Sequence, residues 1–141
     1  MKTLSVPQKA PAVQEEFYGR EGEIKYAGMH LLVELWHARY LTDSVKIRGI
    51  LIKAIEACGA TMLSIDLHTF SPNSGISGVA VLQESHISIH TWPEFGFAAV
   101  DIFMCGKEGF PEKAREYIRT ALEGKEGYVM AVPRGGNPGS K

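Results

Sequence analysis

Residues 44–58 carry an apolar pattern that constrains the fold more tightly than any other stretch of the chain. Six apolar residues recur at i, i+3, i+4, i+7, i+8 and i+11, which places them on a single face of a helix: Ile47, Ile50, Leu51, Ala54, Ile55 and Cys58. Thr42 or Asp43 can cap the start of this helix, and Gly59 its end. A helix with one apolar face must pack against another layer, so the rest of the chain has to supply that layer.

Strand-like segments supply it. The apolar runs and their spacing predict strands over residues 29–36, 61–70, 78–83, 85–91, 96–105 and 127–132. A second amphipathic helix is predicted over residues 111–122, with Pro111 at its first position. The SPNSG stretch, residues 71–75, has the composition of a tight turn or loop. This order favours an α+β fold, a two-layer sandwich with two helices packed on one face of a mostly antiparallel sheet.

The length of the chain is that of one domain. We expect this domain to span residues 23–134, between a flexible N-terminal extension, residues 1–22, and a flexible tail, residues 135–141. A net charge of -1 with 22% charged residues gives no support to a nucleic-acid or membrane-surface partner. The two cysteines form no CxxC motif, and the N-terminus lacks the apolar stretch of a secretory signal, so a cytoplasmic location is the default expectation.

Alternation along the predicted strands describes the sheet face away from the helices. In residues 97–105 the apolar positions Ala98, Val100, Ile102 and Met104 suit the helices, which leaves Asp101, Phe103 and Cys105 on the opposite face. The same rule places His86, Ser88 and His90 together, and likewise Asp66 and His68. A face rich in histidines, acids and a cysteine suggests a functional site or an interface.

The string QESHISIHTWPE, residues 83–94, is the densest group of chemically active side chains. It sets hydroxyls, two imidazoles and two carboxylates within twelve residues. Hydrogen bonds across a sheet are one explanation for such a strand. A Ser-His-acid hydrolase is a poorer one, because no G-x-S-x-G elbow surrounds Ser85.

The run GISGVAVLQESHISIHTWPEFGFAAVDIFMCG, residues 75–106, closely resembles the processing region of the prokaryotic S-adenosylmethionine decarboxylase proenzymes. The resemblance extends upstream through KYAGMHLLVELW, residues 25–36, and GATMLSIDLHTFSPN, residues 59–73. The ESHxSxHTWPE string followed by DxFxCG makes it highly specific. The SPNSG loop is one residue longer than in many relatives.

The resemblance implies that the chain cuts itself between Glu84 and Ser85. The Ser85 hydroxyl attacks the Glu84 carbonyl to give an ester, β-elimination cleaves the chain, and hydrolysis leaves a covalent pyruvoyl group in place of Ser85. His90 matches the base that removes the α-proton, and Ser77 matches the serine that assists processing. The two products would contain 84 and 57 residues, the second number being 141 − 84.

The same resemblance implies decarboxylation of S-adenosylmethionine, which yields the aminopropyl donor of spermidine synthesis. The pyruvoyl ketone condenses with the substrate amine and accepts electrons, as pyridoxal phosphate does elsewhere. Cys105 matches the proton donor, Phe70 the residue that stacks on adenine, and Glu94 the carboxylate that binds the ribose. Without the resemblance, Cys105 and Phe70 would be assigned to the core and Glu94 to a solvated turn. A homodimer of cleaved chains is also implied, and no metal.

Two alternatives remain open at this stage. A relative with the same processing machinery but arginine or ornithine as substrate would have no use for Phe70 and Glu94. From another class, the chain is a non-enzymatic partner subunit or a metal-binding module that uses His68, His86, His90 and Cys105. The His86/His90 spacing on a strand, without a clear fourth ligand, argues against the metal module.

Overall fold

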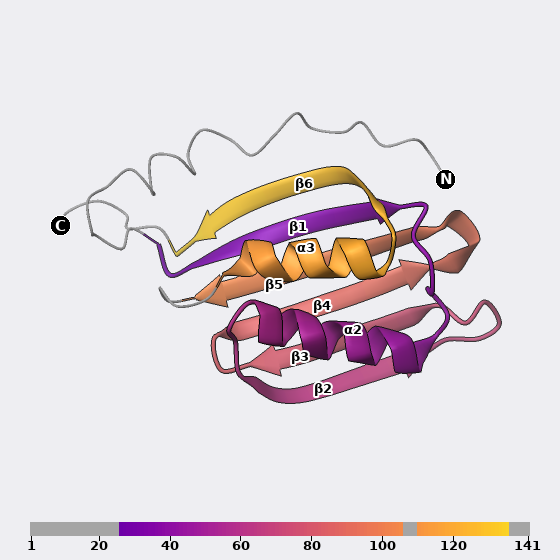
Figure 1. The fold of residues 1–141 in the computed structure, drawn as a ribbon, viewed down its shortest axis with the longest axis horizontal. Helices are drawn as coiled ribbons and strands as arrows, with labels where there is room; N and C mark the ends of the chain where they lie inside the picture. The colour runs from indigo at the N-terminus through magenta and orange to yellow at the C-terminus, as the bar shows by residue number, and fades with distance from the viewer. Residues whose placement is uncertain (1–25, 106–109, 136–141) are drawn as a thin grey trace.

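The computed structural model describes residues 26–105 and 110–135, and Figure 1 shows the arrangement of the elements. They are β1 (Gly28–Trp36), α2 (Ser44–Ala57), β2 (Met62–Thr69), β3 (Ile76–Leu82), β4 (Ser85–Trp92), the short 3-10 helix η1 (Pro93–Phe95), β5 (Phe97–Cys105), α3 (Pro111–Ala121) and β6 (Lys125–Arg134). The predicted extension, residues 1–22, and all but the first residue of the predicted tail lie outside the described residues.

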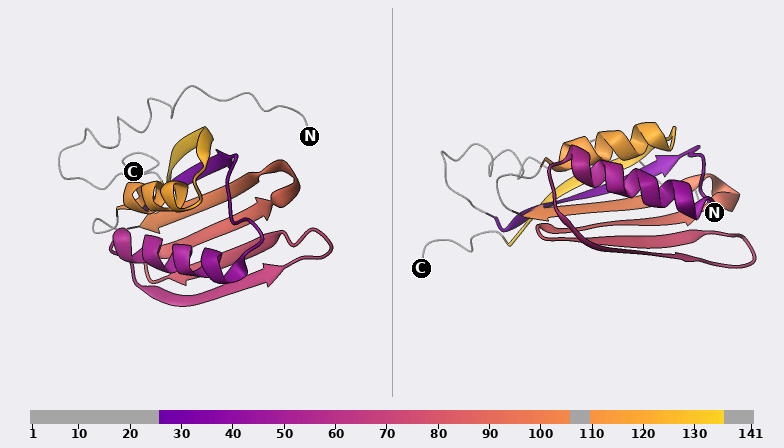
Figure 2. Two further views of the ribbon diagram at one scale, coloured as in Figure 1. Left: turned by 45° about the vertical axis from the view of Figure 1, so that its right-hand side comes forward. Right: turned by 60° about the horizontal axis from the view of Figure 1, so that its bottom comes forward.

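The six strands form one sheet in the order β2-β3-β4-β5-β1-β6. Every pairing is antiparallel, so β1 lies between β5 and β6 although it comes first in the chain. Both helices cover the same face, as the right-hand view of Figure 2 shows. The α+β two-layer sandwich predicted from the sequence is therefore confirmed.

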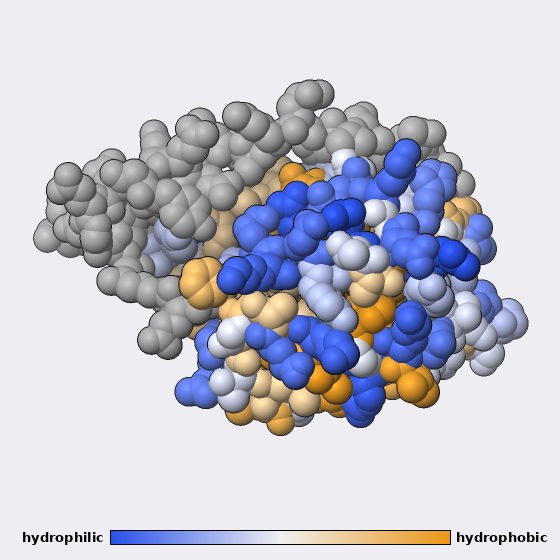
Figure 3. Space-filling model, viewed as in Figure 1, coloured by the Kyte–Doolittle hydropathy of each residue, from blue (hydrophilic) through white to orange (hydrophobic). Residues whose placement is uncertain are grey.

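The core lies between the helices and this sheet face. Ile47, Leu51 and Ala54 of α2 are fully buried, as predicted from their shared helix face. The Asp43 side chain caps α2 by accepting a hydrogen bond from the Lys46 backbone N–H at 3.0 Å. Gly59 follows the helix with φ of 75°, a conformation that glycine adopts without steric cost. Hydrophilic side chains cover much of the solvent-facing side of α3 (Figure 3).

Strand boundaries differ from the prediction where pairing extends beyond the apolar run. β3 begins at Ile76 rather than at residue 78, because Ser77 pairs with His90 on β4. β6 begins at Lys125, which pairs with Trp36, and it ends at Arg134, which pairs with Gly28. The 3-10 turn η1 was not predicted, and it separates β4 from β5. Backbone hydrogen bonds to a neighbouring strand, which the local pattern does not show, decide these ends.

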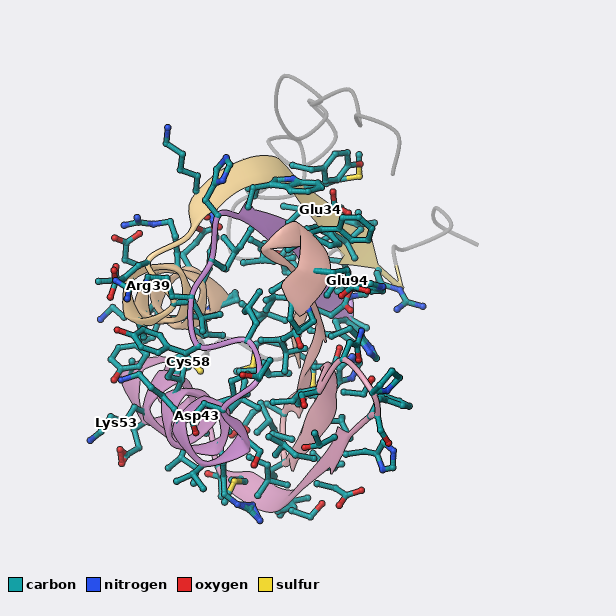
Figure 4. All side chains as sticks on the ribbon, turned by 90° about the vertical axis from the view of Figure 1, so that its right-hand side faces the viewer. Glu34, Arg39, Asp43, Lys53, Cys58 and Glu94 are labelled. Carbon is teal, nitrogen blue, oxygen red and sulfur yellow. The ribbon has the colours of Figure 1, made fainter. Side chains whose placement is uncertain are left out.

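We call the sheet face away from α2 and α3 the outer face. The alternation predicted for β5 is confirmed, since Ala98, Val100, Ile102 and Met104 are buried against the helices. Asp101, Phe103 and Cys105 are half-buried on the outer face. Figure 4 shows Glu34 and Glu94 on this side of the sheet, away from Arg39, Asp43 and Lys53.

Candidate functional site

The Glu84–Ser85 bond lies in the turn that joins β3 to β4. Leu82 pairs with Ser85, so Gln83 and Glu84 form a two-residue hairpin turn. Ser85 has φ of 155°, a positive value that residues with a Cβ rarely adopt. Conformations of this kind cost about 1–3 kcal/mol and persist only where the surrounding structure enforces them. The bond expected to break is therefore flanked by a strained residue.

The Glu84 carbonyl oxygen accepts two hydrogen bonds from Cys105. The Cys105 backbone N–H donates at 3.0 Å and its thiol Sγ donates at 2.6 Å. The Glu84 carboxylate is held separately, because it accepts from the Thr61 backbone N–H at 3.0 Å. Two donors aimed at one carbonyl oxygen stabilise the negative charge that develops there when a nucleophile attacks the carbonyl carbon.

His86 is the imidazole beside Ser85. The Ser85 Oγ lies 3.5 Å from the His86 Nδ1. Burial lowers the pKa of His86, and the neighbouring His30 and Arg134 lower it further, while Asp101 acts in the opposite direction. The ring is therefore neutral, and able to accept a proton, at pH values where an ordinary histidine is partly charged.

A second imidazole, His30 of β1, was missed by the sequence reasoning. Its Nε2 lies 3.2 Å from Asp101 Oδ1, and Ser88 donates a hydrogen bond to Asp101 Oδ2 at 3.1 Å. The His30 ring meets the His86 ring edge-on, with 6.1 Å between centroids. Strand alternation could have found His30, since it lies between the buried residues Met29 and Leu31.

Ser77 and His90 form a separate pair. They are directly opposite each other on β3 and β4, and their side chains hydrogen-bond at 2.8 Å between Oγ and Nδ1. The sheet register brings these two residues together, since they are thirteen positions apart in the chain, and their contact was not predicted from the sequence. The pair is exposed on the outer face.

The two residues predicted to bind adenosine also lie near this pair. Phe70 directly follows β2, is 48% exposed, and meets the His68 ring at 4.4 Å between centroids. Glu94 lies in η1, just after β4 (Figure 4). The Asn73 side chain donates to both Glu94 carboxylate oxygens at 3.2 Å, which ties the SPNSG loop to η1. The sequence reasoning did not assign a role to Asn73.

The predicted site residues, together with His86, thus divide into two groups. The cleavage cluster comprises Glu84, Ser85, His86 and Cys105, and the binding cluster comprises Phe70, Ser77, His90 and Glu94. Ser85 begins β4, and His90 lies five residues further along the same strand. At about 3.3 Å per residue, the two Cα atoms are ~17 Å apart. One chain does not bring His90 to Ser85.

The same strand geometry separates the residues of the metal-binding alternative. Within residues 26–105 and 110–135, no three His, Cys, Asp or Glu side chains gather in a way that would hold a metal ion. His86 and His90 belong to different clusters because four residues of extended strand lie between them. The helices of this part of the chain are also too short or too polar to cross a membrane.

Comparisons with known proteins identify the family of the chain. The family described as S-adenosylmethionine decarboxylase matches residues 29–135. An S-adenosylmethionine decarboxylase proenzyme of Methanococcus maripaludis is 46% identical over 114 residues, which are 79% of this chain and 93% of the relative. A proenzyme of the same description from Thermodesulfovibrio yellowstonii is 46% identical over 110 residues, which cover 77% of this chain and 81% of the relative.

A solved structure is similar to this chain in its fold. The crystal structure of the adenosylmethionine decarboxylase from Aquifex aeolicus is similar with a TM-score of 0.71 and 36% sequence identity. The match covers 83% of this chain and 98% of that one. On the family match and these relatives together, the chain belongs to the S-adenosylmethionine decarboxylase family.

Proposed function

We propose that this chain is a proenzyme that cuts itself before Ser85 and then decarboxylates S-adenosylmethionine through a pyruvoyl group. The observation that carries the proposal is the geometry of the scissile bond. Its carbonyl oxygen accepts two hydrogen bonds from Cys105, and the residue after it has φ of 155°. The family to which the chain belongs supplies the reaction and the substrate.

Cleavage begins when the Ser85 Oγ attacks the Glu84 carbonyl carbon. The oxygen that gains negative charge is the one that already accepts from the Cys105 N–H and Sγ, so no donor has to move. Transfer of the acyl group to Oγ frees the Ser85 backbone nitrogen and relieves the strain at its φ angle. Loss of the α-proton then eliminates the ester and separates the fragment of 84 residues from the fragment of 57, as 141 − 84 requires.

The residues around position 85 fit a pyruvoyl group, because Ser85 begins β4 and directly follows a carbonyl that accepts two hydrogen bonds. When formed, that group supplies an electron sink for the carbanion left by loss of CO2. Cys105 is the thiol beside it, paired through its backbone with the turn that carries Ser85. We assign to its Sγ the proton that the substrate α-carbon receives after loss of CO2.

His90 is the base proposed for the elimination, and Ser77 holds its ring through the 2.8 Å hydrogen bond. Both are ~17 Å from Ser85 along β4, too far for proton transfer within one chain. We therefore propose a homodimer in which His90 and Ser77 of one copy serve Ser85 of the other. A two-fold axis would place the binding cluster of each copy against the cleavage cluster of its partner.

Substrate recognition follows the same division. Phe70 offers an exposed ring for stacking on adenine, and Glu94 offers carboxylate oxygens to the ribose hydroxyls. Asn73 fixes the Glu94 carboxylate by donating to both of its oxygens. Phe70 and Glu94 belong to the same cluster as His90. The binding cluster of one copy would therefore hold the nucleoside while the cleavage cluster of the second copy performs the reaction.

The test has two parts. Intact mass spectrometry of the purified, incubated chain should show fragments of 84 and 57 residues, the second without a free N-terminal amine. Release of CO2 is then compared for S-adenosylmethionine, arginine and ornithine under one set of conditions. A chain that stays full length contradicts the cofactor, whereas faster turnover of arginine or ornithine contradicts only the substrate.

A further inference from the structure

Chain cleavage needs a proton acceptor before it needs His90. The Ser85 hydroxyl must lose its proton as Oγ attacks the Glu84 carbonyl, and the backbone nitrogen must gain one as it leaves. His90 of the same chain is ~17 Å away, whereas the His86 Nδ1 is 3.5 Å from the Ser85 Oγ. Among the described residues, His86 is the side chain that hydrogen-bonds to Ser85.

We propose that His86 is the base of the acyl shift: it takes the Ser85 hydroxyl proton and returns it to the Ser85 backbone nitrogen. This inference rests on the proposed self-cleavage. The bond between Ser85 Oγ and the Glu84 carbonyl carbon forms, and the Glu84 C to Ser85 N bond breaks. The proton passes from Oγ to His86 Nδ1 and then to the nitrogen, so the step is an isomerisation with no other reactant.

The surroundings of His86 suit a neutral base. Its ring contacts Phe103 at 5.8 Å and His30 at 6.1 Å between centroids, both edge-on. The charged or titratable groups that act on it are His30 on β1, Asp101 on β5 and Arg134 at the end of β6, while its partner on β3 is the apolar Val81. Burial lowers the pKa of His86, so the imidazole stays unprotonated near neutral pH.

The two other side chains near the scissile bond, Cys105 and Glu84, are engaged in hydrogen bonds of their own. The Cys105 thiol donates its proton to the Glu84 carbonyl oxygen at 2.6 Å, where it stabilises the developing charge. A thiol that has given up its proton to act as a base would lose that donor. The Glu84 carboxylate accepts a hydrogen bond from the backbone N–H of Thr61, the residue before β2.

Hydrogen bonds among His30, Asp101 and Ser88 fix the His30 ring, which packs against the His86 ring. Asp101 accepts from both the His30 imidazole and the Ser88 hydroxyl, at 3.2 and 3.1 Å. His30 and Asp101 touch neither Ser85 nor Glu84, so we assign them as positioning residues. Asp101 also raises the pKa of His86, against the net downward shift.

The experiment isolates the acyl shift in a chain that carries His90→Ala. Without the elimination base the ester accumulates, and hydroxylamine splits it at position 84. Hydroxylamine is raised until more of it no longer increases the rate of splitting. Ester that is already present then splits in an initial burst. A slow phase follows, and its rate is the rate at which new ester forms by the acyl shift. We expect His86→Gln, added to His90→Ala, to slow this phase by about 10²-fold, the low end of general-base effects, without changing the burst amplitude.

The burst amplitude reports the equilibrium between the amide and the ester before hydroxylamine is added. A base changes the rate at which this equilibrium is reached and not its position, so an unchanged burst distinguishes a base from a residue with a structural role. The matched control is His37→Asn, at an exposed position with φ of 56° that asparagine tolerates. It should leave both phases unchanged. An equal slow-phase rate in the His86→Gln chain, or a loss confined to the burst, overturns the proposal.

The pH dependence gives a second measurement that does not require substitution of His86. In the His90→Ala chain the slow phase should rise with pH through a pKa below the ordinary histidine value of about 6.5. Asp101→Asn should move this inflection to lower pH, because it removes a group that favours the charged imidazole. An inflection that Asp101→Asn leaves in place contradicts the assignment of His86. A His90→Ala chain that hydroxylamine never splits, beside a wild-type chain that never cleaves, overturns the self-cleavage together with this inference.

Discussion

The two ends of β4 carry the residues that we assign to different parts of one reaction. At the Ser85 end, a single chain supplies the nucleophile, a carbonyl with two donors and an adjacent imidazole. At the His90 end, the same chain supplies a base held by Ser77, an exposed aromatic ring and a carboxylate fixed by Asn73. The first end holds the groups that we assign to the acyl shift, and the second holds those that we assign to binding and to elimination.

This difference follows from the extended strand that carries both ends. A helix would separate residues five positions apart by only about 7.5 Å along its axis, whereas a strand separates them by ~17 Å. In the proposed homodimer, each reaction centre therefore combines one end from each of two copies. The comparison predicts that the early step of cleavage is independent of a partner and that the later steps depend on one.

The largest expected effect comes from combining two inactive chains. Ser85→Ala retains the binding cluster but lacks the nucleophile, and His90→Ala retains the nucleophile but lacks the base. When the two are co-expressed in equal amounts, we expect about half of the His90→Ala chains to pair with the other variant and to cleave. Mass spectrometry distinguishes the fragments. If cleavage is absent in the mixture but normal in wild type, each reaction centre is built from one chain. The proposal that two copies share each centre is then wrong.

The next effect concerns the cleavage cluster alone. Cys105→Ala removes the Sγ donor to Glu84 but keeps the backbone N–H donor, so we expect cleavage to slow by about tenfold. Decarboxylation by the cleaved form should fall by ~10²-fold or more, because the proton donor is absent. Cys105→Ser is the matched control, since its hydroxyl restores a donor and should restore cleavage more than turnover. Normal turnover by Cys105→Ala would remove its assignment as the acid.

A smaller effect is expected in the binding cluster. Loss of a charged hydrogen bond costs about 1.5–3 kcal/mol, so Glu94→Gln should lower kcat/KM for S-adenosylmethionine by roughly ten- to a hundredfold. Phe70→Ala acts in the same direction through lost stacking, and Asn73→Ala by less, because Asn73 only orients Glu94. Cleavage should proceed at the wild-type rate in all three. Glu56→Gln, on the exposed surface of α2, is the control for loss of a carboxylate.

The smallest expected effect is on the thermal stability of the fold, through Glu34. Glu34 on β1 and His90 on β4 both pair with Ala99 of β5. Burial raises the pKa of Glu34, so the folded chain binds this proton more tightly than the unfolded chain does. The contribution to stability is present below the unfolded pKa, about 4.3, and is lost as the pH rises through the folded value. Glu34→Gln should therefore have a slightly higher Tm than wild type at pH 7, and this gain should vanish near pH 4. A gain of equal size at both pH values would mean that the carboxylate charge is not its cause.

The elements that the sequence predicted well are those whose signals are local. The helix over residues 44–57 follows from its apolar spacing and the Asp43 cap, and the burial of Ala98, Val100, Ile102 and Met104 follows from strand alternation. The family followed from the ESHxSxHTWPE string, which the comparisons confirm over residues 29–135. The starts of β3 and β6 were misplaced because they depend on pairing with β4 and β1.

The α+β class, the family and the residue types available for the reaction can be predicted from the amino-acid sequence, because helix and strand periodicities and the motif are properties of neighbouring residues. Which of those residues meet depends on the tertiary structure. Sheet register brings Cys105 to the Glu84 carbonyl from twenty-one positions away and His30 to Asp101 from seventy-one, whereas it leaves His90 at the far end of the strand from Ser85. Contacts between distant segments depend on the order and register of the strands, which no local pattern specifies.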